Sequence, residues 1–589
     1  MKTSSKGKKK KKKISMKEAF EKVKVINSKN NKGRKQKGFR DVWWKYPIFI
    51  AKVVRDTRPL SYIILFSILA GFLCLYLVRD SFLDSIKKEE KFDFVEGSVG
   101  AISSLNPIFL TQNPIDKSIH ELVFERFIEI DKEGDPSPGI ASSWDISDDF
   151  LTYTFDIEDG HFWQDGEPLI IDDVIFTFDS AIKLAEKYNT DSVGVPLVGM
   201  EVEKVDNNTI KFVLENTNAI FFEAVSIYIV PKHRLESVSL SDLRFDIFTK
   251  YPLGSGPYKV VKSEPNIVML EASLYYQFPI SIPEFTYRIY DDLDSLEIAF
   301  RNEELDAISG VDSGGMSFVE EYSNYNVLEA SLEKRTKMIF FNNRRDSLSD
   351  IDIRQALNYI TNKQSLLEGS GIPGEVALGV LPSSSWAFNS EAEQYLYSPE
   401  IAEGLFEDMK YIKNEKNGYY EGEDNKILSF TLSYLKNESN DRLVNVLKEL
   451  WNDEGIILNL DPLTYAQITQ EIISTRNFEM LLYEVETTVD PDQYNLWHSL
   501  KRDYPDLNLS GYEFNRVDIL LEEARTEQSK KIRKEDYILF QKYLMNDAPV
   551  IFIYHPQYKY VVPADLIGPE LENITFPENR FRNIYEWNS

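Results

Sequence analysis

An uncharged run of 19 residues, LSYIILFSILAGFLCLYLV, extends from Leu60 to Val78 and is bounded by Arg58 and Arg79. As an α-helix it would rise about 28 Å, close to the thickness of the hydrocarbon core of a bilayer. Helices of soluble proteins are seldom apolar on every face for so many turns. The run therefore predicts one transmembrane helix over residues 60–78.

The charge on either side of this run predicts its orientation. Residues 1–60 hold 21 Lys and Arg against 4 Asp and Glu, a net charge of +17, whereas residues 61–589 carry −45. Basic flanks stay in the cytoplasm, so residues 1–59 are expected to be a basic cytoplasmic tail, with Lys8–Lys13 near the anionic lipids of the inner leaflet. The acidic body would repel polyanions, and no nucleic-acid partner is expected.

Two kinds of N-terminal processing compete with an uncleaved anchor, and the sequence disfavours both. A cleavable signal peptide has a basic region much shorter than the 59 residues that precede the apolar run here. It also ends in a cleavage site of small residues, which this sequence lacks. Acylation at Cys74 would need small residues before it, where Phe72 and Leu73 stand. We therefore expect a cell-membrane protein with a single-pass anchor, a tether over residues 79–91 and an extracytoplasmic C-terminal body.

The body alternates between strand-like and helix-like patterns, which indicates a mixed α/β fold. Residues 153–157 (YTFDI) and 210–214 (IKFVL) alternate as half-buried strands do. Residues 174–181 and 441–451 have helical spacing, the latter with Leu443, Val446, Leu447 and Leu450 on one face. No internal repeat is visible, which argues against solenoids and propellers.

The sequence offers little to an enzyme, a metal or a cofactor. The single cysteine lies in the apolar run and the five histidines are far apart, so no cysteine-based or HExxH-type metal site is expected. No GxSxG or GxxxxGK[ST] motif occurs, which removes the usual signs of a serine nucleophile or a phosphate loop. The body is therefore predicted to be a binding protein that has no catalytic residue and no cofactor.

Several short motifs follow one another in the body: PGIASSW at 138–144, LTYTF at 151–155, WQDG at 163–166 with DDV at 172–174, PLGSGPY at 252–258, RQAL at 354–357 and APVI at 548–551. In this order they resemble the extracellular solute-binding proteins of family 5, the oligopeptide, dipeptide and nickel binders of ABC importers. The likeness extends from about Val95 to the C-terminus. It departs from the family at Asp352, where Arg is usual, and at Asn362, where Asp is usual.

The resemblance implies a two-lobed, three-domain α/β fold of the periplasmic-binding-protein type (class II, cluster C), preceded here by the transmembrane helix. Lobe 1 would combine a core domain of residues 92–134, 250–330 and 556–589 with an accessory domain of residues 135–249. Lobe 2 would comprise residues 331–555. Such proteins hold the main chain of a peptide through backbone groups, and side chains lie in hydrated spaces.

The resemblance also implies where a ligand would bind. Peptide binders of the family often place an Asp three residues before an acidic-Pro pair, where it binds the α-ammonium group of the ligand. Here Asp490-Pro491 is the pair and the neutral Thr487 takes the place of that Asp, so the sequence leaves open whether a free peptide amino terminus is needed, with Glu484, Glu486 and Asp490 as alternative partners for it. The predicted ligand-binding residues are Leu105, Asn106, Trp386, Glu484, Thr487, Thr488, Asp490 and Trp497. Core packing of Trp386 and a turn role for Leu105-Asn106 are competing interpretations.

The predicted function is capture of peptides or similar solutes between two closing lobes, followed by delivery to the permease and ATPase subunits of an ABC importer. The alternative is a membrane-tethered peptide sensor that has no role in transport. The cytoplasmic residues 1–59 contain no signalling domain, which favours delivery.

Overall fold

The computed structural model describes residues 93–188, 192–311, 316–572 and 574–588. The predicted cytoplasmic tail, transmembrane helix and tether (residues 1–91) lie outside these ranges. Within them, no helix is both long enough and apolar enough to cross a membrane.

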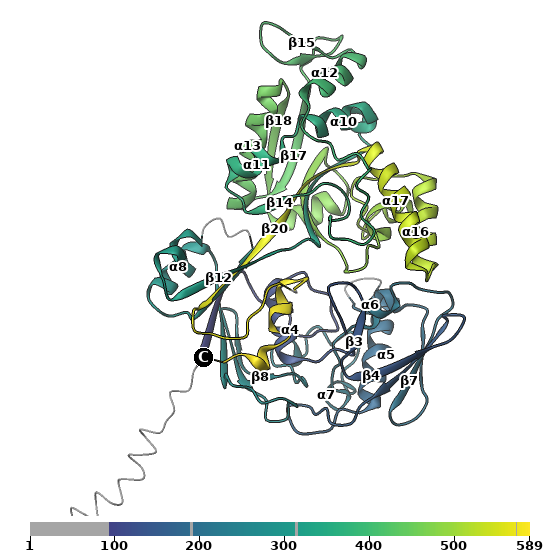
Figure 1. The fold of residues 1–589 in the computed structure, drawn as a ribbon, viewed down its shortest axis with the longest axis vertical. Coiled ribbons are helices and arrows are strands. Elements are labelled where there is room, and N and C mark those ends of the chain that lie inside the picture. Colours follow the sequence, from purple (N-terminus) through teal and green to yellow (C-terminus); the bar gives the residue numbers. More distant parts are fainter. Residues whose placement is uncertain (1–92, 189–191, 312–315, 573, 589) are drawn as a thin grey trace, which may run out of the picture. The chain divides into compact units, whose positions relative to one another are not determined.

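The first part of the described chain, with its C-terminal segment, forms a mixed α/β unit around a sheet in the order β11-β1-β10-β9-β8, in which β1 is parallel to both of its neighbours. We call this unit, together with the accessory region below, lobe 1 (Figure 1). Its elements are β1 (Asp93–Val99), α4 (Pro114–Val123), β8 (Tyr258–Glu264), β9 (Ile267–Ala272), β10 (Glu284–Tyr290), α8 (Leu293–Arg301), β11 (Ala307–Val311) and β12 (Tyr325–Ser331), with 3-10 turns at Pro577–Phe581 and Ile584–Glu586.

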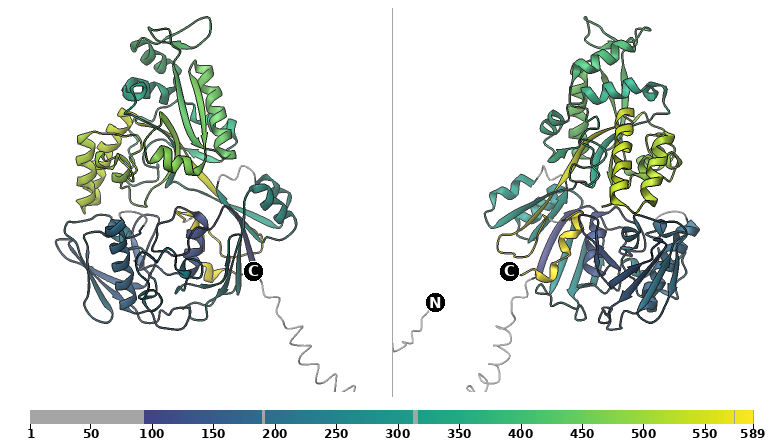
Figure 2. Two further views of the ribbon diagram at one scale, coloured as in Figure 1. Left: turned by 180° about the vertical axis from the view of Figure 1, so that it is seen from behind. Right: turned by 45° about the vertical axis from the view of Figure 1, so that its right-hand side comes forward.

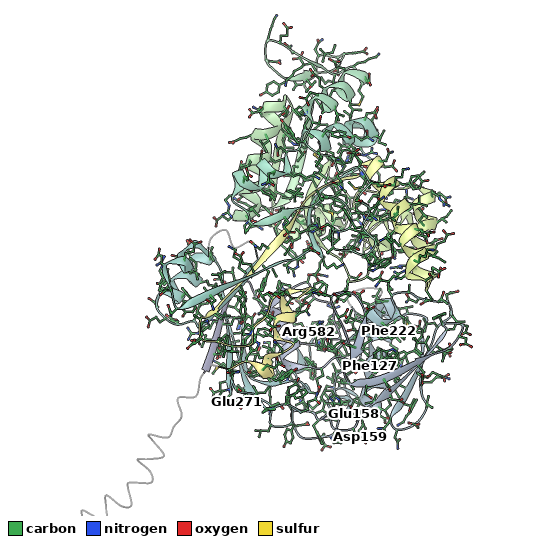
Figure 3. The ribbon with its side chains drawn as sticks, viewed as in Figure 1. Phe127, Glu158, Asp159, Phe222, Glu271 and Arg582 are labelled. Carbon is green, nitrogen blue, oxygen red and sulfur yellow. The ribbon has the colours of Figure 1, made fainter. Side chains whose placement is uncertain are left out.

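The accessory region has its own antiparallel sheet, in the order β4-β5-β7-β6, and its own hydrophobic core. In Figure 3 Phe127 and Phe222 lie within this region, whereas Glu158 and Asp159 lie at its outer edge. The elements are β2 (Ile128–Ile130), β3 (Pro136–Pro138), β4 (Ala141–Ile146), β5 (Thr152–Ile157), α5 (Ile171–Tyr188), β6 (Glu201–Lys204), β7 (Thr209–Val213), α6 (Phe221–Val225) and α7 (Lys232–Leu235).

The remaining residues form lobe 2, built on strands in the order β18-β17-β19-β13-β20. Its strands are β13 (Arg335–Phe341), β14 (Gly374–Val376), β15 (Ile412–Lys413), β16 (Tyr420–Glu421), β17 (Ser429–Leu435), β18 (Ile457–Leu463), β19 (Met480–Glu486) and β20 (Val550–Pro563). Its helices are α9 (Asp346–Ser349), α10 (Ile351–Ile360), α11 (Lys363–Ser370), α12 (Pro399–Asp408), α13 (Glu438–Glu454), α14 (Tyr465–Gln467), α15 (Tyr494–Trp497), α16 (Asn515–Thr526) and α17 (Lys530–Asp547).

The strands and helices that the pattern predicts are present. In β5 the side chains of Tyr153, Phe155 and Ile157 are buried in alternation, and β7 alternates in the same way. Helix α13 begins at the Asn437 cap and ends at Gly455, whose φ of 92° suits a glycine. Its buried face comprises Asn440, Leu443, Val444, Leu447 and Trp451, so the predicted Val446 and Leu450 lie only at the margin of that face.

Two of the sequence motifs meet inside lobe 1. The amide of Gln164 donates to the carbonyls of Val123 (3.0 Å) and Tyr258 (2.6 Å) and accepts from the N–H of Gly254 (3.0 Å). A Cβ at Gly254 would lie 1.8 Å from the Val123 carbonyl oxygen, so the backbones approach too closely for any side chain. The WQDG and GSGPY motifs therefore form one buried junction that fixes β8 against α4.

Strand β20 connects the two lobes, and both Figure 1 and the view from behind in Figure 2 show it crossing between them. Its first residues pair with β13, from Phe340 opposite Val550 to Lys337 opposite Tyr554. Its later residues pair with β12 and β11 of lobe 1. Pro556, which has no N–H to donate, lies where the pairing partners change.

The C-terminal segment is held in lobe 1 by a buried ion pair. Arg580 donates to Glu96 of β1 at 2.6 Å, and these side chains are 1% and 0% exposed. Arg580 also donates to the Tyr287 hydroxyl (2.6 Å), and Tyr560 donates to Glu96 (2.9 Å). Because the charges are fully removed from water, each depends on the other.

We expect Arg580→Leu to lower the free energy of unfolding by about 3–5 kcal/mol, because it leaves the carboxylate of Glu96 buried without a cation. Urea unfolding followed by tryptophan fluorescence measures this change. The matched control is Arg288→Leu, which removes an exposed pair with Glu304 (2.7 Å) and is expected to cost about 0–1 kcal/mol. Equal losses in the two variants would contradict the assignment.

Candidate ligand-binding cavity between the lobes

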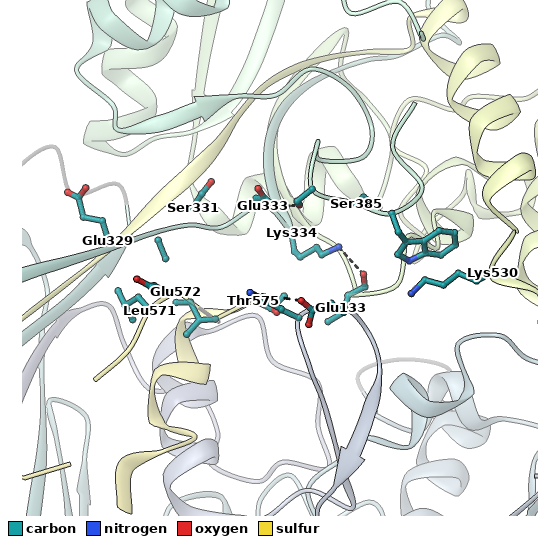
Figure 4. A pocket seen from close by; sticks show the side chains of 16 residues that line it. Glu133, Glu329, Ser331, Glu333, Lys334, Ser385, Lys530, Leu571, Glu572 and Thr575 are labelled. Atoms are coloured by element: carbon teal, nitrogen blue, oxygen red, sulfur yellow. Dashed lines mark hydrogen bonds and ion pairs between the residues drawn. The ribbon is translucent and has the colours of Figure 1, made fainter. Parts of the chain in front are cut away.

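A cavity of about 590 Å³ lies between the lobes, within the range of small-ligand sites, roughly 300–1,000 Å³. Six segments that are far apart in the sequence line it, as Figure 4 shows. Lobe 1 and the connection between the lobes contribute Lys132, Glu133, Glu329, Ala330, Ser331, Glu333, Lys334, Leu571, Glu572, Ile574 and Thr575, and lobe 2 contributes Ser384, Ser385, Trp386, Val489 and Lys530.

The wall that includes Val489 is a loop after β19, tied to the connection between the lobes. Thr487 donates to the carbonyl of Lys334 from its backbone N–H (2.8 Å) and from its hydroxyl (3.2 Å). In return, Lys334 Nζ donates to the carbonyl of Val489 at 2.8 Å. Burial lowers the pKa of Lys334 from its ordinary value, although nearby carboxylates oppose that shift. Side-chain hydrogen bonds thus fix the loop as a wall of the cavity.

The aromatic wall is built on helix α17. Trp386 packs against Tyr537 with 6.0 Å between ring centroids, and Lys530 Nζ and Arg533 Cζ lie 5.3 and 5.5 Å from the Trp386 ring. Arg533 also pairs with Asp490 at 2.6 Å. Burial raises the pKa of Asp490, and the Arg533 pair offsets part of that rise. The ion pair holds the loop and the aromatic wall together.

The lining mixes four glutamates with three lysines, and Figure 4 shows Glu333, Glu133 and Lys334 near its middle. Figure 4 shows Glu329 and Glu572 at one end and Lys530 at the other. Glu329 is partly neutralised by Lys559 at 3.0 Å, and Glu333 accepts a hydrogen bond from the Ser384 hydroxyl. Such a polar lining suits a ligand that has charges or hydrogen-bonding groups along its length, and Trp386 adds an aromatic surface to it.

Of the eight residues that the sequence predicts for the site, only Trp386 lines this cavity. Leu105, Asn106 and Trp497 are each 0% exposed, and Leu105 and Trp497 belong to hydrophobic cores. Asn106 accepts from the N–H of Ile108 (3.2 Å), which is turn structure.

The other four predicted residues lie on or beside the loop. Glu484 pairs with Lys337 of β13 at 3.3 Å. Thr487 and Asp490 bind protein groups as described above, and the hydroxyl of Thr488 donates to the carbonyl of Asp490 at 3.0 Å. Both hydrogen-bond donors of Thr487, its N–H and its hydroxyl, are therefore used by the Lys334 carbonyl. That any of the eight residues contacts a ligand stays a prediction.

Most residues that line the cavity were not predicted from the sequence. Val489 lies between two predicted residues, and an apolar side chain within a polar cleft loop is the one signal that could have marked it. Lys334 lies in the short link between β12 and β13. Because these two strands belong to different lobes, the link is one of the connections between the lobes. Lys132, Lys530 and Glu572 carry no recognisable pattern. Within the described ranges, no group of three His, Cys, Asp or Glu is placed to hold a metal ion.

Relatives of known sequence cover most of the chain. An oligopeptide-binding protein, AppA, from Bacillus subtilis is 23% identical over 514 residues, which are 85% of this chain and 92% of that protein. A dipeptide-binding protein from Escherichia coli is 21% identical and covers 78% of this chain and 88% of its own length.

Solved structures have the same fold. NikZ from Campylobacter jejuni in complex with Ni(L-His) superimposes with a TM-score of 0.73 at 25% identity and covers 85% of this chain and 100% of that chain. AppA from B. subtilis in complex with a nonapeptide gives a TM-score of 0.71 at 22% identity, over 84% of this chain and 98% of that chain. The predicted cluster C type of periplasmic-binding-protein fold is therefore confirmed for the body.

The family described as bacterial extracellular solute-binding proteins, family 5, matches residues 135–504 through its middle region. That match covers more than half of the chain and includes the link between the lobes, the Trp386 loop and the wall at Val489. The chain thus belongs to the bacterial extracellular solute-binding proteins of family 5.

Proposed function

We propose that this chain is a membrane-anchored, extracytoplasmic receptor that captures peptides or similar solutes between two closing lobes and delivers them to an ABC import permease. The observation that carries the proposal is the cavity, because both lobes and their connection supply its walls. A ligand that contacts both lobes favours the closed state by its differential affinity for it. Family membership makes the chain a non-enzymatic binding protein of ABC transport.

The composition of the cavity supports a peptide-like ligand. Carboxylates and ammonium groups in one lining match the opposite charges of a zwitterion, and Trp386 adds an aromatic surface for a side chain. Two of the similar proteins are described as binding oligopeptides and dipeptides. Because Thr487 is neutral and donates to Lys334, we expect the ligand's amino group, where it has one, to be bound by other groups.

The division of the chain follows from the same proposal. Residues 1–59, 60–78 and 79–91 would be tail, transmembrane helix and tether; residues 92–134, 250–330 and 556–589 the core domain of lobe 1; residues 135–249 its accessory domain; and residues 331–555 lobe 2. The apolar run and the basic flank support the anchor. A tether keeps the receptor at high effective concentration near its permease.

Native mass spectrometry of the full chain purified in detergent tests the ligand class. The proposal predicts a set of peptide masses that co-purify and are released on mild denaturation. Refolded chain that neither retains nor regains any peptide from a mixed library would contradict it. Recovery of permease and ATPase subunits with the tethered chain would support import, whereas recovery of signalling proteins alone would support a sensor and contradict delivery.

Substitutions at two tryptophans distinguish a role in the cavity from a role in the hydrophobic core. We expect Trp386→Ala to weaken binding of the co-purified peptides with little loss of stability, because this side chain is only partly buried. Trp497→Ala should instead lower the free energy of unfolding by about 3–5 kcal/mol, because it empties a fully buried site. Isothermal titration and urea unfolding measure the two effects. Unchanged affinity in Trp386→Ala would remove the aromatic wall from the proposed site.

A further inference from the structure

A glutamate of the accessory region holds the cavity wall of lobe 2 by its backbone. Glu223 of helix α6 accepts from the N–H of Val489 at 2.8 Å and from the N–H of Asp490 at 3.1 Å, one bond to each carboxyl oxygen. Consecutive backbone donors on one carboxylate are a strong arrangement, because the acceptor is charged and both bonds form together. The contact crosses from lobe 1 to lobe 2.

The N–H, the carbonyl and the side chain of Val489 are each held by another part of the protein. Its N–H donates to Glu223 and its carbonyl accepts from Lys334 Nζ at 2.8 Å. Its side chain is 8% exposed and packs in the hydrophobic core of the accessory region, although the residue belongs to lobe 2. Since Val489 also lines the cavity, whatever holds it shapes the binding site.

Two further contacts join the lobes at the same junction. The N–H of Ala219 donates to the carbonyl of Arg525 and the hydroxyl of Thr217 donates to the carbonyl of Thr526, both at 2.7 Å. At the other side, Lys117 of α4 pairs with Glu486 at the end of β19. The segment of residues 217–223 therefore lies along lobe 2, and Glu223 is its contact with the cavity loop.

We propose that Glu223 is a positioning residue of the ligand site: its side chain clasps the backbone of Val489 and Asp490 across the junction and holds the two lobes in the closed arrangement. This inference rests on the proposed function in one respect, namely that the lobes open and close. The clasp is made of protein groups alone, so its contribution to closure can be measured in the chain without solute.

The charges around Glu223 decide how the clasp responds to pH. Burial raises the pKa of Glu223 to about 7, and Asp490 adds to that rise, whereas the two N–H donors and Lys334 oppose it. Asp490 is itself paired with Arg533, and Glu129 on the neighbouring β2 is engaged by Arg582 at 3.5 Å. With the lobes apart, Glu223 would be exposed to water and return towards its ordinary pKa of 4.5.

The direction of the pH effect follows from these two values. Between pH 4.5 and about 7 the closed form binds a proton that the open form does not, so closure becomes more favourable as the pH falls. Above about pH 7 the carboxylate is charged in both forms, so closure is least favourable there and no longer changes with pH through this group. The protonated carboxyl group keeps one carbonyl oxygen that accepts from the loop.

Hydrogen exchange measured by mass spectrometry on the full chain in detergent, without added solute, tests the clasp. Glu223→Ala leaves the two loop N–H groups without an acceptor, so the peptide that contains Val489 and Asp490 should exchange roughly ten- to a hundredfold faster. The matched control is Glu215→Ala, an exposed position in the same region. Unchanged exchange in Glu223→Ala would overturn the proposal.

A pH series needs no disruptive variant and keeps the proposal testable if Glu223→Ala misfolds. After correction for intrinsic rates, protection of the same peptide in the natural chain should fall between pH 5 and 7, by up to tenfold per pH unit, and level off above about pH 7. Glu223→Gln, which cannot ionise, should show no such fall. Equal slopes in the two proteins would overturn the inference. Failure to find a bound solute, by contrast, would leave this result intact and count only against the proposed function.

Discussion

The architecture depends on one strand that the two lobes share. Strand β20 pairs with β13 in its first residues and with β11 and β12 in its last ones, so the sheets of both lobes continue through the same backbone. The chain crosses again between β12 and β13, at residues 332–334. The lobes stay joined through these connections and cannot slide past one another, because the ladder on each side fixes its own register. The cavity lies beside these connections, and Glu333 and Lys334 of the second crossing form part of its wall.

Buried charge serves different purposes in different parts of the molecule. The pair of Arg580 and Glu96 joins the C-terminal segment to the first strand, and the core of lobe 1 depends on both partners being present. At the junction of the lobes the charges are less completely matched. Glu223 has two backbone donors instead of a cation at close range, and Asp490 lies nearby. Because no cation lies close to it, this contact would cost less to open than the pair of Arg580 and Glu96, as the proposed closing and opening of the lobes requires.

The family and the fold could be predicted from the sequence because their signals are local. The alternation of residues 153–157 and the Gly254-Ser255-Gly256 turn depend on neighbouring residues and on close backbone approach, so short motifs carry them. One departure from the family is also explained locally. Asn362 stands where Asp is usual and caps α11, with its side chain accepting from the N–H of Ser365, so the exchange preserves the cap.

The cavity could not be predicted in the same way. Its walls come from six segments that are brought together only when β20 has joined the lobes, and no periodic pattern marks them. Position in a family motif placed Trp386 in the wall and Thr487 beside it, but the same reasoning selected Leu105 and Trp497, which the hydrophobic cores enclose. An apolar side chain within a motif can serve packing or binding, and the sequence alone does not separate the two.

We propose that the solute binds between the lobes and contacts both of them. A crystal structure of the chain purified together with its co-purifying solute tests this most directly. We expect ligand density in the cavity, in contact with Trp386 and Val489 on one side and with the lobe 1 lining at Lys132, Glu133 or Thr575 on the other. Density confined to one lobe, or located outside this cavity, would contradict it.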